Sequence, residues 1–190
     1  MTDSGDGGRI LASLNQVRAF HQQVGALIEA ADELMDRGQW QPRTNQCASV
    51  GTVPSRSDSW MPQDVFHFYE KKSGGASGVI PFVSVALFDR EDRTDFTEPL
   101  LTAGILKCMP GAEASTTDLL GYSHIHVWMP GRTDDGAART VAQATEWPGW
   151  KQPIETITTL GVPLTSVRRI DELRETLIAP LLELLKKLDR

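Results

Sequence analysis

The sequence has few cysteines. Among its 190 residues only Cys47 and Cys108 are cysteine, and no Cys-x-x-Cys pair or Cys/His cluster is present. Two cysteines can form at most one disulfide bond, which excludes the disulfide-rich scaffolds of small secreted proteins. This usage is typical of a reducing compartment, and we expect a cytoplasmic protein.

Positive charge and long apolar runs are also scarce. The formal net charge is −6 at pH 7, whereas nonspecific nucleic-acid binding needs a basic field, so a nucleic-acid partner is not expected. The longest apolar stretch, residues 79–88, is too short to cross a bilayer and contains Pro81. The polar first residues differ from a signal peptide, and we expect residues 1–8 to be flexible and no membrane association.

Several motifs of catalytic proteins are missing as well. The chain contains no Walker loop, no Gly-x-Gly-x-x-Gly and no Gly-x-Ser-x-Gly. Residues 89–95 are rich in acids but lack the turn glycine of calcium loops, so they predict a solvated hairpin tip. The expected order of elements, which is a helix, three strands, a helix and a strand, resembles the core of the restriction-endonuclease-like nucleases. Asp89 and Lys107 would then lie at two positions of the nuclease motif. That chemistry needs a second carboxylate two residues before the lysine, where this chain has Ile105.

Helical periodicity dominates the beginning of the chain. Apolar residues recur at alternating spacings of four and three, and Gly38 supplies a stop signal, which predicts one helix over residues 9–37. Such a helix is about 42 Å long. Strands of ordinary length span about 20 Å, so part of the helix should overhang any sheet on which it packs. The stripe, with Val17 and Val24 as candidate contact positions, is either core or a self-pairing seam.

A stretch without periodicity follows, over residues 39–63. Loops of this length are uncommon in compact domains and are usually functional or disordered. Its tryptophans, Trp40 and Trp60, have two interpretations: they fill gaps in the core, or they are the aromatic anchors of a binding lid.

Four strands are expected at residues 64–72, 78–88, 99–108 and 122–129. The second and third are apolar on both faces, which is typical of strands in the middle of a sheet covered on both sides. A modest helix is expected over residues 133–147. One or two strands should follow, broken by Gly161 and Pro163. The last helix is expected from about Asp171 to Leu188, kinked at Pro180, with Leu181 and Leu185 as further candidate contacts.

His124 and His126 lie two residues apart in the fourth expected strand, which puts both on one face. A His-x-His pair on a strand can chelate zinc, but a third ligand is needed, and His67 is the best candidate. His67 can join the pair in a Greek-key strand order but not in a simple meander, where about 14 Å separates the two strands. The other interpretation is that the histidines are structural.

These patterns predict a single α+β domain over residues 9–190. We expect a mixed, mostly antiparallel sheet of five or six strands, flanked by a long N-terminal helix and a leucine-rich C-terminal helix. The favoured function is a non-catalytic accessory or interaction protein without a cofactor, which associates with itself or with a protein partner. The alternative is a hydrolase or nuclease dependent on zinc or another divalent metal held by the histidine pair.

Overall fold

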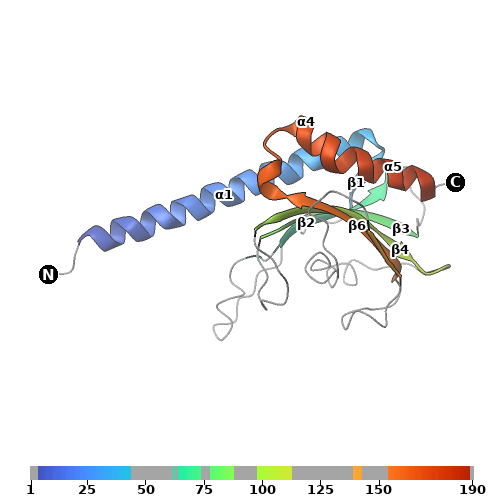
Figure 1. Cartoon of the computed structure of the whole chain (residues 1–190), viewed down its shortest axis with the longest axis horizontal. Helices are drawn as coiled ribbons and strands as arrows, with labels where there is room; N and C mark the ends of the chain where they lie inside the picture. The colour runs from blue at the N-terminus through green and yellow to red at the C-terminus, as the bar shows by residue number, and fades with distance from the viewer. Residues whose placement is uncertain are drawn as a thin grey trace.

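The chain folds as an α+β domain, as the sequence predicts. We describe a computed structural model in which the placed residues are 4–43, 62, 64–73, 78–87, 98–112, 139–142 and 154–188. Two long helical segments lie on one face of a curved antiparallel sheet, and the first helix projects far beyond the sheet (Figure 1). The fold therefore has a globular body and a helical arm.

The first helix, α1, spans Ser4–Arg37 and has 34 residues. It ends where Gly38 was expected to stop it, and the Gly38 N–H donates to the Met35 carbonyl at 2.9 Å. A Cβ on Gly38 would lie 2.7 Å from a methyl group of Leu182, so glycine permits the close approach of the two helices. The beginning differs from the prediction, because the helix starts at Ser4 rather than at residue 9.

Among the described residues, six strands form one sheet. They are β1 (Trp40–Pro42), β2 (Asp64–Lys71), β3 (Val79–Ala86), β4 (Leu100–Cys108), β5 (Arg139–Ala142) and β6 (Ile154–Pro163). Their order is β1-β2-β3-β4-β6-β5, and every pairing among the described strands is antiparallel, in line with the mostly antiparallel sheet that the sequence predicts. The predicted strands near residues 64, 78 and 99 are confirmed.

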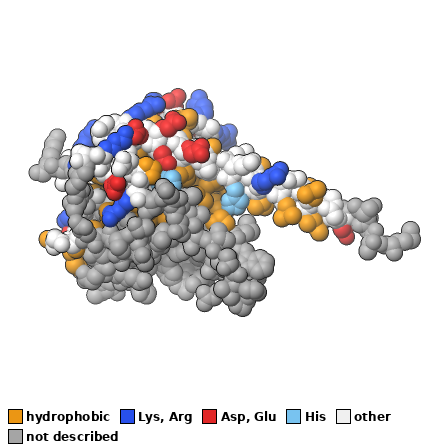
Figure 2. Space-filling model, turned by 180° about the vertical axis from the view of Figure 1, so that it is seen from behind, with side chains coloured by type: hydrophobic (Ala, Val, Ile, Leu, Met, Phe, Trp, Pro, Cys, Tyr) orange, Lys and Arg blue, Asp and Glu red, His pale blue; other side chains and the backbone are white. Residues whose placement is uncertain are grey.

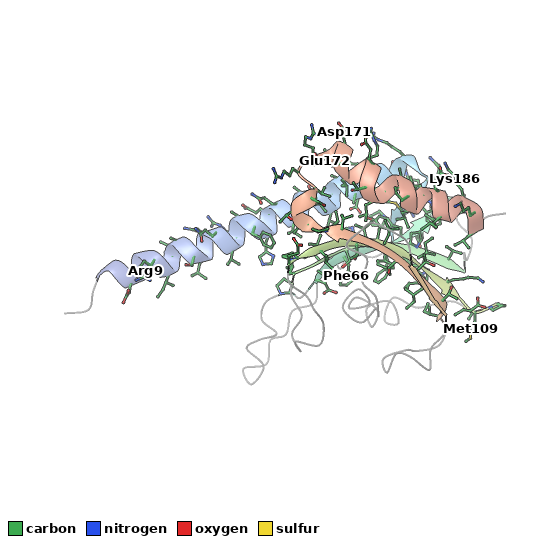
Figure 3. All side chains as sticks on the ribbon, viewed as in Figure 1. Arg9, Phe66, Met109, Asp171, Glu172 and Lys186 are labelled. Atoms are coloured by element: carbon green, nitrogen blue, oxygen red, sulfur yellow. The ribbon has the colours of Figure 1, made fainter. Side chains whose placement is uncertain are left out.

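Both faces of the central strands are buried, as their sequences indicate. On one face, Val83, Val85, Leu101 and Ala103 pack against the helices. The other face carries a second cluster: Phe66, Phe68, Ile80, Phe82, Leu106, Cys108, Ile154 and Ile157. Figure 3 shows Phe66 on the side of the sheet away from the helices. The described helices all lie on one face, whereas the sequence led us to expect helices on both.

The C-terminal helix contains an irregular turn before its proline. It runs from α4 (Ile170–Leu173) through a π-helical turn (Arg174–Ile178) to α5 (Ala179–Leu188). Pro180 has no N–H to donate to a carbonyl four residues earlier, and its ring crowds that carbonyl, so a wider turn relieves the conflict. The N-cap position of this helix is Arg169, two residues before Asp171, near which the helix was expected to begin.

Three other expectations need correction. The described part of the helix predicted at residues 133–147 is strand β5, in which Val141 pairs with Ile157. Gly161 does not break a strand, because β6 continues through it and pairs Gly161 with Thr102. The segment predicted as a loop from residue 39 begins with strand β1. In each case pairing with a neighbouring strand outweighs a weak local preference.

Candidate interaction site

The apolar stripe of α1 divides into two halves with different environments. Toward its C-terminus the stripe is buried against the sheet and the last helix, through Val24, Ile28, Ala31, Leu34 and Met35. Toward the N-terminus the same pattern continues without cover: Ile10 is 62% exposed, Leu11 60%, Leu14 61%, Val17 40% and Phe20 36%. Figure 2 shows hydrophobic side chains along this projecting arm. We call these five residues the arm stripe.

The arm carries little charge. Between Ile10 and Ile28 the only charged side chain at neutral pH is that of Arg18. Nearer the end, Asp6 and Arg9 form an exposed ion pair at 3.7 Å, an interaction that contributes little in water. A helical face that stays in solvent usually carries charged side chains, whereas this one presents aliphatic and aromatic residues. The arm stripe therefore has the composition of a contact surface.

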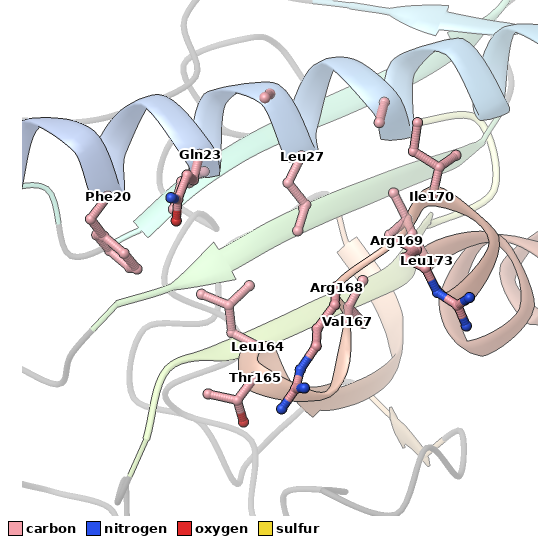
Figure 4. Close-up of a pocket in the computed structure, with 13 residues that line it drawn as sticks. Phe20, Gln23, Leu27, Leu164, Thr165, Val167, Arg168, Arg169, Ile170 and Leu173 are labelled. Atoms are coloured by element: carbon pink, nitrogen blue, oxygen red, sulfur yellow. The ribbon is translucent and has the colours of Figure 1, made fainter.

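A pocket lies where the arm joins the body. Its volume is about 570 Å³, and it is bounded by α1 and by the segment that connects β6 to α4, which includes the short helix η2 (Leu164–Ser166). Phe20 and Leu27 project from α1 toward Leu164 and Val167 (Figure 4). The walls are mostly apolar, and Phe20 belongs to both the arm stripe and the pocket. The two features therefore form one continuous surface.

Two arginines lie at the pocket, Arg168 and Arg169. The Arg169 guanidinium pairs with Glu172 at 2.9 Å, and Glu172 also accepts the backbone N–H of Arg168 at 2.7 Å. These backbone and side-chain hydrogen bonds hold the pKa of Glu172 below its ordinary value. Glu172 thus balances the charge of Arg169, and Arg168 supplies a further positive charge at the pocket.

A second cluster of polar side chains lies between α1 and β2. The carboxylate of Asp32 accepts the Tyr69 hydroxyl at 2.8 Å, and its two oxygens lie 2.9 and 3.0 Å from Nδ1 of His67. Burial raises the pKa of Tyr69 well above its ordinary value, and the negative charge of Asp32 and the hydrogen bond to it act in the same direction. The cluster joins helix to sheet through a carboxylate that is largely removed from water.

Asp32 is a residue that our sequence reasoning missed. It lies four residues after Ile28 and three before Met35, which puts it beside the buried stripe. A carboxylate in such a place requires a hydrogen-bond partner, and that requirement was the available signal. No comparable pattern in the sequence marks the pocket, because its second wall comes from a segment that is distant from α1 along the chain.

The predicted contact residues fall into different environments. Trp40, Val24, Leu181 and Leu185 are buried in the core of the chain itself, so their side chains offer no surface in this conformation. The ring of Trp40 also lies 5.6 Å from the ammonium of Lys71. Val17 is exposed and belongs to the arm stripe. Trp60 lies outside the described residues.

Of the three histidines in the predicted metal site, the structure describes only His67. His67 lies on β2 with its ring against Asp32, while His124 and His126 lie outside the described residues. Among the residues that the structure describes, no three histidine, cysteine or carboxylate side chains are grouped as a metal ion would require. A zinc site built on the histidine pair stays a prediction.

None of the helices in the described part of the chain has both the length and the apolar composition to span a membrane. Comparisons of the chain with protein-family models, with curated proteins and with solved structures gave no match in any of the three. The function must therefore be inferred from the surface itself.

Proposed function

We propose that this protein is a non-catalytic interaction protein whose contact surface is the arm stripe of α1 and the pocket at its base. The observation that supports this proposal is the division of one apolar stripe into a buried half and an exposed half. The few charged residues of the arm support it further. We expect the protein to act in the cytoplasm, in line with its low cysteine content.

The arm needs a partner for energetic reasons. Helix propensity alone contributes little to the stability of a helical segment that nothing covers. The exposed part of α1 is such a segment, and it contains Gly7 and Gly8, which disfavour a helix by about 1 kcal/mol each. Tertiary packing supplies most helical stability in proteins, and no described element packs on this part.

The arm stripe can supply that packing energy when another surface covers it. Complete burial of a large apolar side chain contributes about 1.5–3 kcal/mol. Since the five side chains are roughly half exposed, covering them would contribute about 1 kcal/mol each, or about 5 kcal/mol in all. A gain of this size offsets the cost of the glycines and leaves a surplus for association.

Site-specific photo-crosslinking tests the proposal. A photoreactive amino acid at Leu14 should give a covalent protein adduct in the native cells, whatever the identity of the partner. The same amino acid at Ala19 is the control, because Ala19 is exposed on the opposite side of the helix. Adducts at neither position, or equal adducts at both, would contradict the proposal.

A metal-dependent hydrolase or nuclease is the alternative, and it depends on His124 and His126. No observation on the described residues favours it. Purification without chelators followed by metal analysis tests it directly, because a functional site would carry stoichiometric metal that is lost on the change of both histidines to alanine.

A further inference from the structure

We propose that the arm stripe binds the arm stripe of a second copy of this chain, with the two arms antiparallel. This inference rests on the proposed function and specifies the partner. It accounts at once for the spacing of the exposed residues, the position of the body and the glycine-rich end of the arm.

The spacing of the stripe allows the arm to pair with itself. Ile10, Leu14, Val17 and His21 alternate at intervals of four and three, which is the pattern of a coiled-coil seam. In an antiparallel pair centred between Leu14 and Val17, each residue of one copy faces a residue of the other copy, and the two residue numbers add up to 31. Leu14 of one copy then packs against Val17 of the other, and Ile10 packs against His21. Each of these four seam positions therefore packs against another seam position, and no two like charges face each other along the seam.

The position of the body selects the antiparallel orientation. From Val24 onward, the seam side of α1 is occupied by the sheet and the last helix of its own chain. In a parallel pair the second helix would run along this side as far as Arg37, through the space that the first body fills. In the antiparallel pair the two bodies lie at opposite ends, and each arm ends as it reaches the other body.

The end of the second arm stops where the body begins. In the register that totals 31, residues 7 and 8 of one copy lie beside residues 24 and 23 of the other, where the body of that copy covers the seam. Gly5, Gly7 and Gly8 carry no side chains, so this end of the arm is thin enough to lie close to that body. The pocket lies off the seam, because Gln23 and Ala26 share the face of α1 that carries Ala19.

The available surface indicates a reversible dimer. A large apolar side chain has on the order of 100 Å² of apolar surface, so the two half-exposed stripes bury roughly 500 Å² between them. Interfaces are about 60% apolar, which gives a total of roughly 800–900 Å², below the range of about 1,200–2,000 Å² for stable specific complexes and typical of weak, transient ones. We therefore expect a dissociation constant in the micromolar range, about 1–100 µM.

Disulfide crosslinking between two single-cysteine variants tests the orientation and the register. In a background that carries Cys47→Ser and Cys108→Ala, Leu14→Cys and Val17→Cys chains are mixed in equal amounts and oxidised. The antiparallel pair should give a mixed crosslink between position 14 and position 17, at least fivefold more abundant than the crosslinks within either variant alone. Ala12→Cys mixed with Ala19→Cys is the matched control, since these positions also total 31 but lie on the far side of the helix.

Mass measurements on the full chain test the surface. Leu14→Glu should raise the dissociation constant at least tenfold, whereas Ala12→Glu should leave it nearly unchanged, with circular dichroism as a check that both variants are folded.

Three results would overturn the inference. One is a monomer at 200 µM in light scattering, and another is a dominant crosslink between two copies of position 14, which a parallel pair would give. The third is an equal rise of the dissociation constant in Leu14→Glu and Ala12→Glu. A monomeric purified protein with a foreign adduct at Leu14 in cells would refute self-pairing and leave the proposed function standing, while no adduct in cells and a monomer in solution would refute both.

Discussion

Replacement of Asp32 by alanine should be among the most destabilising single changes to a polar residue of α1. The carboxylate accepts hydrogen bonds from Tyr69 and His67, and the side chains of His67 and Asp32 are only 15% and 23% exposed. A hydrogen bond to a charged group contributes about 1.5–3 kcal/mol. The variant also leaves the buried Tyr69 hydroxyl without its acceptor, at a cost of about 1–3 kcal/mol. Because these contributions overlap, we expect a loss of about 3 kcal/mol.

Urea unfolding measures this loss, and Asp36→Ala is the matched control. Asp36 lies one turn further along α1, and its ion pair with Lys72 is much more exposed. Removal of an exposed ion pair costs about 0–1 kcal/mol, so the two aspartates should differ by about 2 kcal/mol or more. Asp32→Asn should fall between the two, since an amide oxygen can still accept one hydrogen bond.

A double-mutant cycle with Tyr69→Phe isolates the interaction. If the two side chains depend on each other as the 2.8 Å hydrogen bond indicates, the double variant should be more stable than the sum of the single effects predicts, by about 1 kcal/mol. Equal losses for Asp32→Ala and Asp36→Ala, together with additive effects in the cycle, would refute the view that this cluster joins helix to sheet.

Three further predictions concern the body and α1. Because the pKa of Tyr69 is raised in the folded state, its contribution to stability is complete below about pH 10 and is lost as the pH rises further, so Tyr69→Phe should flatten the alkaline limb of stability against pH. Gly25→Ala should stabilise the protein by about 0.5–1 kcal/mol in urea unfolding, since no atom lies within 4 Å of the added Cβ, whereas Gly104→Ala should destabilise it by about 1–3 kcal/mol, because its Cβ would overlap the neighbouring strand. Leu181→Ala should cost about 2–5 kcal/mol by calorimetry, and Leu188→Ala, at an exposed position, less than about 0.5 kcal/mol.

The central strands were predictable from sequence because their pattern is strong. Strands β2 to β4 lie within a residue or two of their expected bounds, since apolar residues on both faces and flanking turn residues favour one structure. Strand β5 has only four residues, in a segment with several alanines, and its pairing with β6 outweighs the local preference for a helix. An irregularity of the helix near Pro180 was predictable from the sequence, because proline cannot continue an undisturbed helix.

The interaction site was predictable only in part. The stripe and its overhang follow from the sequence, because a helix of 34 residues is about 51 Å long and the paired strands are about half as long. The point where burial stops, between Phe20 and Val24, depends on the edge of the sheet and cannot be read from periodicity. Val17 and Val24 occupy equivalent positions in the apolar pattern. Only Val24 is covered by the body, so it belongs to the core while Val17 is exposed.

The helicity of the exposed half of α1 depends on the buried half and on pairing. The buried half is fixed by the body, so it provides a nucleus from which the helix extends into the arm without a new nucleation cost. The arm stripe gains its stabilisation from pairing, and the glycines at its end oppose helix formation in an unpaired arm. Helicity of the arm and association should therefore rise together with protein concentration, while the body remains unchanged. Amide hydrogen exchange can separate the two, because dilution below the dissociation constant should accelerate exchange in residues 8–20 and leave that of residues 28–35 unaltered.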